Sequence, residues 1–247
     1  MSAIATAIRP RNAGHDQVAA NDAAKLPDTA RREIYHLVHK GIRACMSETL
    51  VRLGRVDVAA PESVAAALAA VTELLQMCAE HLAHENTFLH TAMERAQPGS
   101  AKRCTVDHDH HVKTIAELQA RLAAVQAADG PGRERALKVL YRLLALFIAE
   151  NFEHMEVEES ENTALLQTHY ADQDLLEIEQ AIHAHIKPER MMVWLRWMLP
   201  NVTRRQRAEM MKGVQAGMPP EVFAAVLEMI KPHLIASERA ALSADLS

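Results

Sequence analysis

The feature that most constrains the fold is a pattern that occurs twice, a histidine followed four residues later by a glutamate. The copies are His81–Glu85 and His154–Glu158. On a helix this spacing places both side chains on one face. The same face is apolar upstream, stepping by three and four through Val71, Leu74 and Cys78 in one case and Leu140, Leu144 and Phe147 in the other. A buried ionised carboxylate is unfavourable unless it is paired or binds a metal, so the pattern favours metal binding.

The remaining sequence predicts an all-α fold. Aromatic residues make up only 4%, glycines number eight, and Ala, Leu and Glu are abundant. Apolar periodicity and breakers predict four long helices: 28–53 with Asp28 as N-cap, 61–96, from near Thr105 to the breaker at 129–132, and from there to about Tyr170. Short connections between long amphipathic helices favour an up-down-up-down four-helix bundle.

The chain is predicted to have three parts: a loose N-terminal tail over residues 1–27, the bundle over 28–170, and a C-terminal extension of short helices over 171–247. Prolines divide the extension, and seven of the twelve methionines and both tryptophans lie between Pro188 and Ile230. This segment is interpreted as core for the short helices, with a homodimer contact, a protein partner or a cover over one bundle end left open.

Composition argues against several classes of partner. The formal net charge is -5 and the pI is about 6.3, which offers no basic surface for nucleic acid or an anionic membrane. The apolar runs are shorter than the roughly 20 residues that a membrane span needs. Cys45, Cys78 and Cys104 show no paired spacing, which predicts reduced thiols and a cytoplasmic protein.

The other two long helices also place histidines on their apolar faces. His39 shares a face with Tyr35 and Ile42, and His108 and His111 share one with Ile115. These donors lie early in the first and third helices and late in the second and fourth, so antiparallel neighbours bring them to one end of the bundle. Seven donors suit two metal ions about 3.5–4 Å apart. Imidazole-rich ligation favours iron, copper or zinc, and iron is preferred for a carboxylate-bridged pair. The predicted ligands are His39, His81, Glu85, His108, His111, His154 and Glu158.

These motifs resemble the hemerythrin-like (HHE cation-binding) family over about residues 28–170. The matching stretches are His39-Lys-Gly-Ile-Arg, His81-Leu-Ala-His-Glu with Phe88-Leu89, Asp107-His-Asp-His-His and His154-Met-Glu-Val-Glu-Glu. The resemblance implies two iron ions bridged by carboxylates and by an oxo or hydroxo group. It also implies one His from the first helix, His and Glu from the second, His from the third, and His with an acid from the fourth.

The chain departs from oxygen-carrying members of that family in two places. His108 and His111 are three residues apart rather than four, which leaves open which of them is a ligand. Glu158 follows its histidine by four residues, where the carriers have Asp five residues after. Both differences resemble bacterial and regulatory relatives.

Neighbouring polar residues are interpreted as non-ligands. A single inward-facing histidine is more often a hydrogen-bonded core residue than a metal ligand, so only the convergence of four helices favours metal binding. Cys78 is predicted to be a small buried residue. His84, His90 and His110 are predicted to lie around the ligands or at the surface, and Glu156 and Glu159 are predicted to be solvated. The histidines predicted to meet solvent are His36, His169, His183, His185 and His233.

Three functions are consistent with such a site. The preferred one is a di-iron protein that binds or senses oxygen, nitric oxide or a redox signal at an open metal position lined by Ile42, Phe88, Ile115 and Phe147. The first alternative is a di-iron enzyme that consumes peroxide or nitric oxide, or delivers iron for repair, although no catalytic residue is identified. The second is a metal-stapled interaction protein that works through its C-terminal helices.

Overall fold

The computed structural model describes residues 27–246, and every regular element in that range is a helix, which confirms the all-α fold class. The predicted tail of residues 1–27 lies, apart from Pro27, outside the described residues. Most of residues 36–169 form four long helical rods. They are α2 (His36–Gly54); α3, η1 and α4 (Pro61–His84, Glu85–Leu89, His90–Ala96); α5 (Lys102–Ala127); and α6, η2 and α7 (Gly130–Val157, Glu158–Asn162, Thr163–His169).

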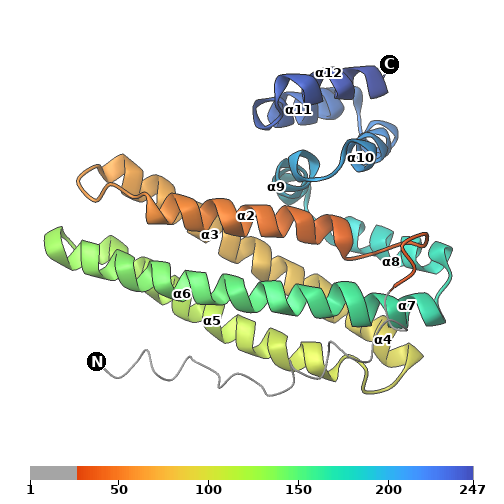
Figure 1. Ribbon diagram of the computed structural model, residues 1–247, viewed down its shortest axis with the longest axis horizontal. Helices are drawn as coiled ribbons and strands as arrows, with labels where there is room; N and C mark the ends of the chain where they lie inside the picture. Colours follow the sequence, from red (N-terminus) through yellow and green to blue (C-terminus); the bar gives the residue numbers. More distant parts are fainter. Residues whose placement is uncertain (1–26, 247) are drawn as a thin grey trace.

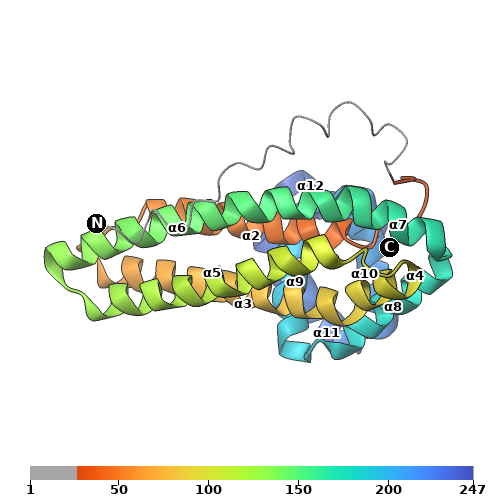
Figure 2. The same ribbon diagram turned by 90° about the horizontal axis from the view of Figure 1, so that it is seen from below.

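The four rods lie side by side, and successive rods run in opposite directions (Figures 1 and 2). Helix α2 packs against α3 and α6, and α5 packs against α3 and α6. Their apolar faces enclose one core, in which each fully buried Leu or Phe contributes about 1.5–3 kcal/mol to folding. The side chains at its centre include Met46, Val71, Leu74, Leu118, Leu140, Leu144 and Phe147.

The rods begin and end at or near the prolines and glycines that the sequence predicts as helix breakers. Pro61 occupies the first turn of α3, where its missing N–H costs no hydrogen bond. The turn after α4 contains Gly99 at φ +86°, and the Glu94 carboxylate accepts hydrogen bonds from the amides of Gly99 (2.7 Å) and Ala101 (3.0 Å). Gly130 begins α6 at φ +40°, a conformation that favours glycine.

The predicted start of the first helix at Asp28 is wrong, because α2 begins at His36. The Asp28 carboxylate accepts from the amide of Ala30 (2.9 Å) and makes a local turn. The Asp28 amide donates to the side chain of Gln167 on α7 (2.8 Å), and Arg31 donates to the Tyr170 carbonyl (2.8 Å). Contacts with α7 and its C-terminal end thus replace the helical hydrogen bonds that the sequence pattern suggested.

Two rods change to a wider π-helical turn, and each change begins at a glutamate of the repeated pattern. Segment η1 begins at Glu85 and η2 begins at Glu158. An extra residue in a turn rotates every later side chain relative to α-helical spacing. After Glu85 the buried residues are therefore Leu89 and His90, whereas Phe88, which we predicted to face the metal position, packs against His185 (ring centroids 5.2 Å apart).

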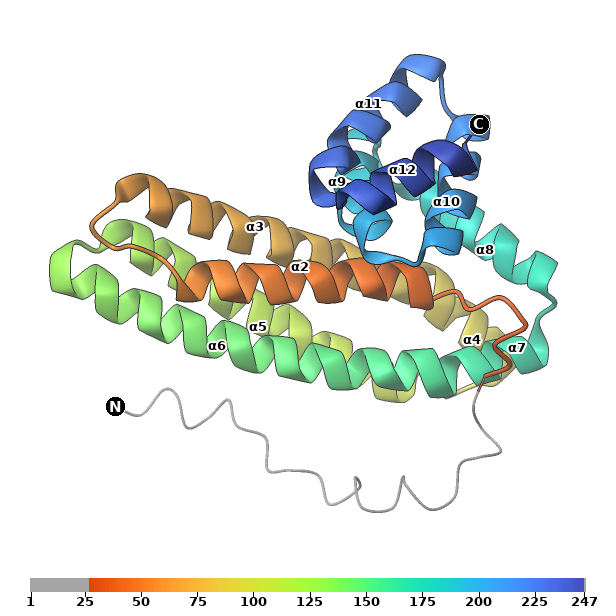
Figure 3. The same cartoon turned by 45° about the horizontal axis from the view of Figure 1, so that its top comes forward.

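The C-terminal residues form the predicted short helices, which lie over the α2 side of the rods (Figure 3). Helix α8 (Asp172–His185) packs on η1. The elements that follow are α9 (Pro188–Met198), η3 (Leu199–Asn201), α10 (Arg204–Gly217), α11 (Pro220–Ile230), η4 (Lys231–His233) and α12 (Ala236–Asp245). They share a second core that includes Leu199, Met211, Val226, Ile230 and Leu242.

Helix α9 joins this extension to the rods. Arg190 donates to both oxygens of Glu80 on α3, with distances of 2.7–3.0 Å. Trp197 Nε1 donates to Glu73 (3.0 Å), and Trp194 is 3% exposed within the core of the rods. The two tryptophans therefore pack with the core of the rods, whereas the interpretation of the Met/Trp segment as core for the short helices holds for Met211.

One rod is more apolar than predicted. The stretch Pro61–Ala96 contains an 18-residue window of mean hydropathy 1.3, so by length and composition it is able to cross a membrane. In this fold 44% of that window is buried inside the protein, and its apolar residues supply the centre of the core.

Substituting Gly41 is expected to loosen α9. A Cβ at this position would lie 2.9 Å from Met198 Cγ and 3.2 Å from the Met198 amide nitrogen. We expect Gly41→Ala to lower the free energy of unfolding by about 1–3 kcal/mol and to speed proteolysis of the C-terminal helices. Urea unfolding and limited proteolysis measure both effects.

The matched control is Gly213→Ala in α10, where a Cβ meets no atom within 4 Å. This change is expected to be neutral or to stabilise by up to about 1 kcal/mol. Equal stability of the two variants would show that α9 does not pack closely on Gly41.

Candidate metal centre

Six of the seven predicted ligands meet at one end of the rods. His39 comes from α2, and His81 and Glu85 come from the junction of α3 and η1. His108 comes from α5, and the last two residues are His154 and Glu158 near the junction of α6 and η2. Their donor atoms form two groups of four, each with all atoms within 4.8 Å of one another.

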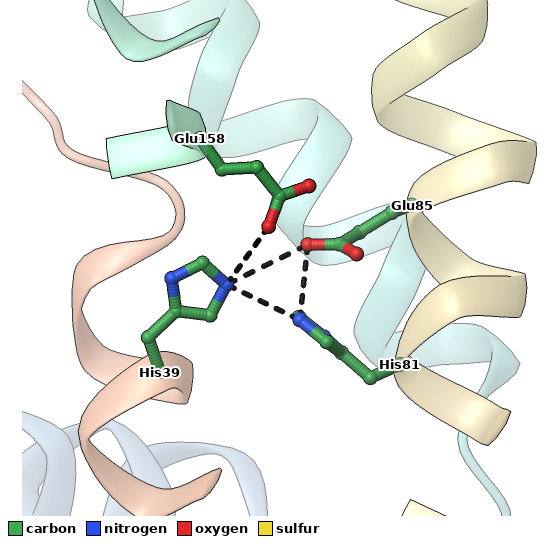
Figure 4. Close-up of side chains that lie close together, drawn as sticks. All are labelled: His39, His81, Glu85 and Glu158. Carbon is green, nitrogen blue, oxygen red and sulfur yellow. Dashed lines mark hydrogen bonds and ion pairs between the residues drawn. The ribbon is translucent and has the colours of Figure 1, made fainter. Parts of the chain in front are cut away.

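The first group contains His39, His81, Glu85 and Glu158. The imidazoles of His39 and His81 point toward each other beneath the two carboxylates (Figure 4), with 3.2 Å between their Nε2 atoms. Glu85 Oε1 lies 3.0 Å from His81 Nε2, and Glu158 Oε2 lies 3.5 Å from His39 Nε2. Two imidazole nitrogens and two carboxylate oxygens therefore face one small space.

The second group contains His108, His154 and the same two glutamates. The Nε2 atoms of His108 and His154 are 2.9 Å apart. Glu85 Oε2 lies 3.6 Å from His108 Nε2, and Glu158 Oε1 lies 3.3 Å from His154 Nε2. Each carboxylate thus turns one oxygen toward each pair of imidazoles, so the two donor groups share both carboxylates.

The carboxylates fit cation binding because their oxygens are otherwise unsatisfied. Glu85 is 2% exposed and Glu158 is fully buried. None of their four oxygens makes a well-formed hydrogen bond with any residue that the structure describes. A buried carboxylate whose oxygens lack hydrogen bonds is strongly unfavourable, and metal held by these residues would lower that cost.

Outer contacts orient the imidazoles. His39 Nδ1 lies 2.9 Å from Glu159 Oε1, and His108 Nδ1 lies 2.8 Å from Asn86 Oδ1. Bonds at Nδ1 leave Nε2 free to face the centre. The prediction that Glu159 is solvated is wrong, because its carboxylate is 20% exposed and also pairs with Arg43.

Titration of the groups is tightly linked in the metal-free protein. Burial opposes the charge on His154, but the Glu158 carboxylate and Asp107 outweigh it and raise the pKa of His154 to about 10. Burial and Glu85 oppose ionisation of Glu158, yet His154 and His108 hold its pKa below the ordinary 4.5. A metal must therefore displace a proton from His154, so metal affinity rises with pH.

His111 is the predicted ligand that joins neither group. It is 2% exposed, and its ring meets His154 edge-on at 5.1 Å and Phe147 at 5.8 Å between centroids. Burial, together with the positive charges of His154 and His108, lowers the pKa of His111 to about 3. Of the two histidines of α5, His108 places a donor atom in these groups and His111 does not.

Three buried polar residues beside the centre were missed or misplaced. His90, predicted to lie off the buried face, is 5% exposed and stacks on His108, with centroids 4.7 Å apart. Cys104 is 1% exposed, and Tyr35 is 1% exposed with a hydroxyl that has no well-formed hydrogen bond among the described residues. Helical spacing carried a signal for two of them, since Cys104 precedes His108 by four residues and Tyr35 precedes His39 by four.

The other histidines lie as predicted, away from the two groups. His110 pairs with Glu150 (3.1 Å) and is partly exposed. The exposed histidines are His169, His183, His185 and His233, and the half-buried ones are His36 and His84.

Comparison with known families gives one match. A family model described as "Hemerythrin HHE cation binding domain" matches residues 31–166, more than half of the chain, and this stretch contains all seven predicted ligands. No curated protein and no solved structure matches the chain significantly.

Removing the outer carboxylate is expected to weaken metal binding. Glu159→Gln leaves His39 Nδ1 without its charged partner, and such changes typically lower metal affinity by roughly 10–100-fold. Competition with a metal-sensitive chelator measures this affinity. Glu156→Gln, an exposed change on the same rod, is the control and should retain wild-type affinity; equal affinity in both variants would contradict the role of Glu159.

The metal-free protein is expected to show a defined pH dependence of stability. The lowered pKa of Glu158 stabilises the fold above its ordinary value of 4.5, and that stabilisation is lost as the pH falls. The raised pKa of His154 stabilises the fold below its ordinary value of 6.5, and that stabilisation is lost as the pH rises toward about 10. Both contributions are complete between these two ordinary values.

Thermal melting of chelator-treated wild type and Glu158→Gln between acid and alkaline pH measures this effect. The melting temperature of the wild type relative to the variant should be highest in the window between the two ordinary values and should fall on both sides. Glu156→Gln should follow the wild type throughout. If the difference in melting temperature between wild type and Glu158→Gln does not change with pH, the titrations of His154 and Glu158 are not coupled.

Proposed function

The chain belongs to the hemerythrin HHE cation-binding family, and from that premise we propose that it holds two iron ions and uses them to bind or sense a small molecule, namely oxygen, nitric oxide or a redox signal. One ion is held by His39 and His81, and the other by His108 and His154. Glu85 and Glu158 bridge them. The observation that carries this proposal is that each carboxylate turns one oxygen to each imidazole pair.

The donor set favours iron and reversible binding. Imidazole with a few carboxylates suits iron, copper or zinc, and a two-metal carboxylate site between helices is characteristic of iron. Iron bound here would supply a redox-active ion with an open coordination position. Four imidazoles against two carboxylates give little anionic charge to stabilise highly oxidised iron, which supports ligand binding over oxidative turnover.

The surroundings suit a small uncharged ligand. Ile42, Ile115 and Phe147 are each no more than 6% exposed. Ile42 and Ile115 follow the donors along α2 and α5, and Phe147 precedes His154 along α6. Apolar walls exclude water and ions while they admit a diatomic molecule. Phe88 is not part of this wall, because it packs outward on His185.

We further propose how the chain is organised around this centre. Residues 28–170 form an up-down-up-down four-helix bundle, and residues 171–247 form a separate extension. This proposal is supported by the directions of the rods (Figure 2) and by the second core of the C-terminal helices. Three buried free thiols are consistent with a reducing, cytoplasmic setting.

One observation favours an enzyme as the second candidate, a di-iron protein that consumes peroxide. Such chemistry needs a proton donor, and the Tyr35 hydroxyl is buried beside the centre without a well-formed hydrogen bond to any described residue. Burial raises the pKa of Tyr35 well above its ordinary value, and the nearby Glu158 and Glu85 carboxylates raise it further. The phenol therefore keeps its proton at neutral pH.

Anaerobic loading with ferrous iron tests the proposal. We expect the wild type to bind two iron ions per chain and to develop a visible ligand-to-metal absorption band when oxygen or nitric oxide is added. His154→Ala removes a ligand and should lose both the second ion and the band, whereas His110→Ala, a change at a partly exposed histidine, should retain them.

Two results would contradict the proposed function. Failure of the wild type to retain iron after anaerobic loading would refute the di-iron proposal. Peroxide consumption faster than that of free iron, reduced in Tyr35→Phe while the iron content is unchanged, would replace ligand binding with the enzyme.

A further inference from the structure

A third group of donors adjoins the two-ion centre. It consists of His90 on α4, Cys104 on α5 and Glu158 at the start of η2. One donor atom from each, an imidazole nitrogen, a thiol sulfur and a carboxylate oxygen, lies within 4.8 Å of the other two. Only Glu158 is shared with the centre described above, and the His90 ring lies against His108.

All three donors are buried. His90 is 5% exposed, and its Nε2 makes no hydrogen bond in the part of the chain that the structure describes. The other ring nitrogen, Nδ1, lies 3.5 Å from the hydroxyl of Thr105. The His90 imidazole and the Glu158 carboxylate, whose oxygens make no well-formed hydrogen bond with any described residue, therefore lie beside the thiol of Cys104, which is 1% exposed.

The Cys104 sulfur lies in a polar environment. It accepts a hydrogen bond from Asn162 Nδ2 at 3.3 Å. The other two cysteines differ, since Cys45 and Cys78 belong to the apolar core of the rods. Cys104 is outside that core cluster and faces ionisable side chains instead.

We propose that His90, Cys104 and Glu158 form a separate cation site for a borderline divalent transition-metal ion such as zinc(II). Thiolate, imidazole and carboxylate are the three ligand types that zinc(II) takes in proteins. The two anionic ligands together balance the charge of a divalent ion. As the sulfur–metal bond forms, the Cys104 thiol releases its proton to solvent.

The shared carboxylate links this site to the two-ion centre. Glu158 carries one negative charge and belongs to all three donor groups. An ion beside Cys104 therefore competes for Glu158 with the ions of the centre. The third site fills most readily when the centre is incompletely loaded.

Cobalt(II) tests the site, because it occupies zinc sites and its bonds to thiolate give an intense near-ultraviolet charge-transfer band. Full-length, chelator-treated protein is titrated with cobalt(II) under reducing, anaerobic conditions. We expect a thiolate band in the wild type and its complete loss in Cys104→Ser. Cys78→Ser, which replaces another buried thiol, should keep the band, and His90→Ala should need at least about tenfold more cobalt(II) to reach half of it.

A second variant separates this proposal from the two-ion centre. His39→Ala disrupts the first group but removes no ligand of the third, so the thiolate band should persist while total cobalt falls. Circular dichroism and thermal melting of each metal-free variant establish that it is folded. If Cys104→Ser does not fold, loss of the band in folded His90→Ala at wild-type saturating cobalt serves as the test.

The proposal is overturned if the wild type binds cobalt(II) without a thiolate band, or if the band survives in Cys104→Ser. Two bound ions without that band would leave the proposed di-iron function intact. Conversely, a thiolate band in a protein that binds only one ion would support the third site and contradict the two-ion centre.

Discussion

The structure depends on the burial of two carboxylates at the meeting point of four rods. Glu85 and Glu158 are almost inaccessible to solvent, and no hydrogen bond satisfies their oxygens within the described chain. In the metal-free protein the positive charges of His154 and His39 offset the desolvation of the carboxylates. The carboxylates in turn raise the pKa of both histidines, although burial acts to lower it. Metal bound by these residues would replace those protons and satisfy the same oxygens, so folding and metal binding would be thermodynamically linked.

The protein around the carboxylates fixes the direction of each donor. Glu159 and Asn86 hold the outer nitrogens of His39 and His108, and the C-terminal extension closes the side of His81. Trp194 from α9 lies 6.4 Å from the His81 ring between centroids. Helix α9 is itself attached to α3 by the Arg190–Glu80 ion pair, one residue from His81, so the extension and the centre share a boundary.

Much of the fold and of the centre could be predicted from the sequence. Helical spacing placed His81 with Glu85 and His154 with Glu158, and the positions of Pro61 and Gly130 indicated where rods begin. Such signals are local: side-chain spacing on a helix and the conformational limits of proline and glycine act within a few residues. Antiparallel neighbours then required the donors to meet at one end.

What the sequence by itself determined is therefore the helical class, the faces that carry the donors and the end of the rods at which they gather. Only the tertiary structure decided which way the side chains after each glutamate point, because wide turns that depart from α-helical spacing begin at Glu85 and Glu158. After Glu85, His90 is buried and Phe88 packs against His185. It also decided that Asp28 pairs with Gln167 rather than starting a helix, and that His108 rather than His111 faces the carboxylates. Each of these outcomes depends on contacts between segments distant in the chain, which no local spacing contains.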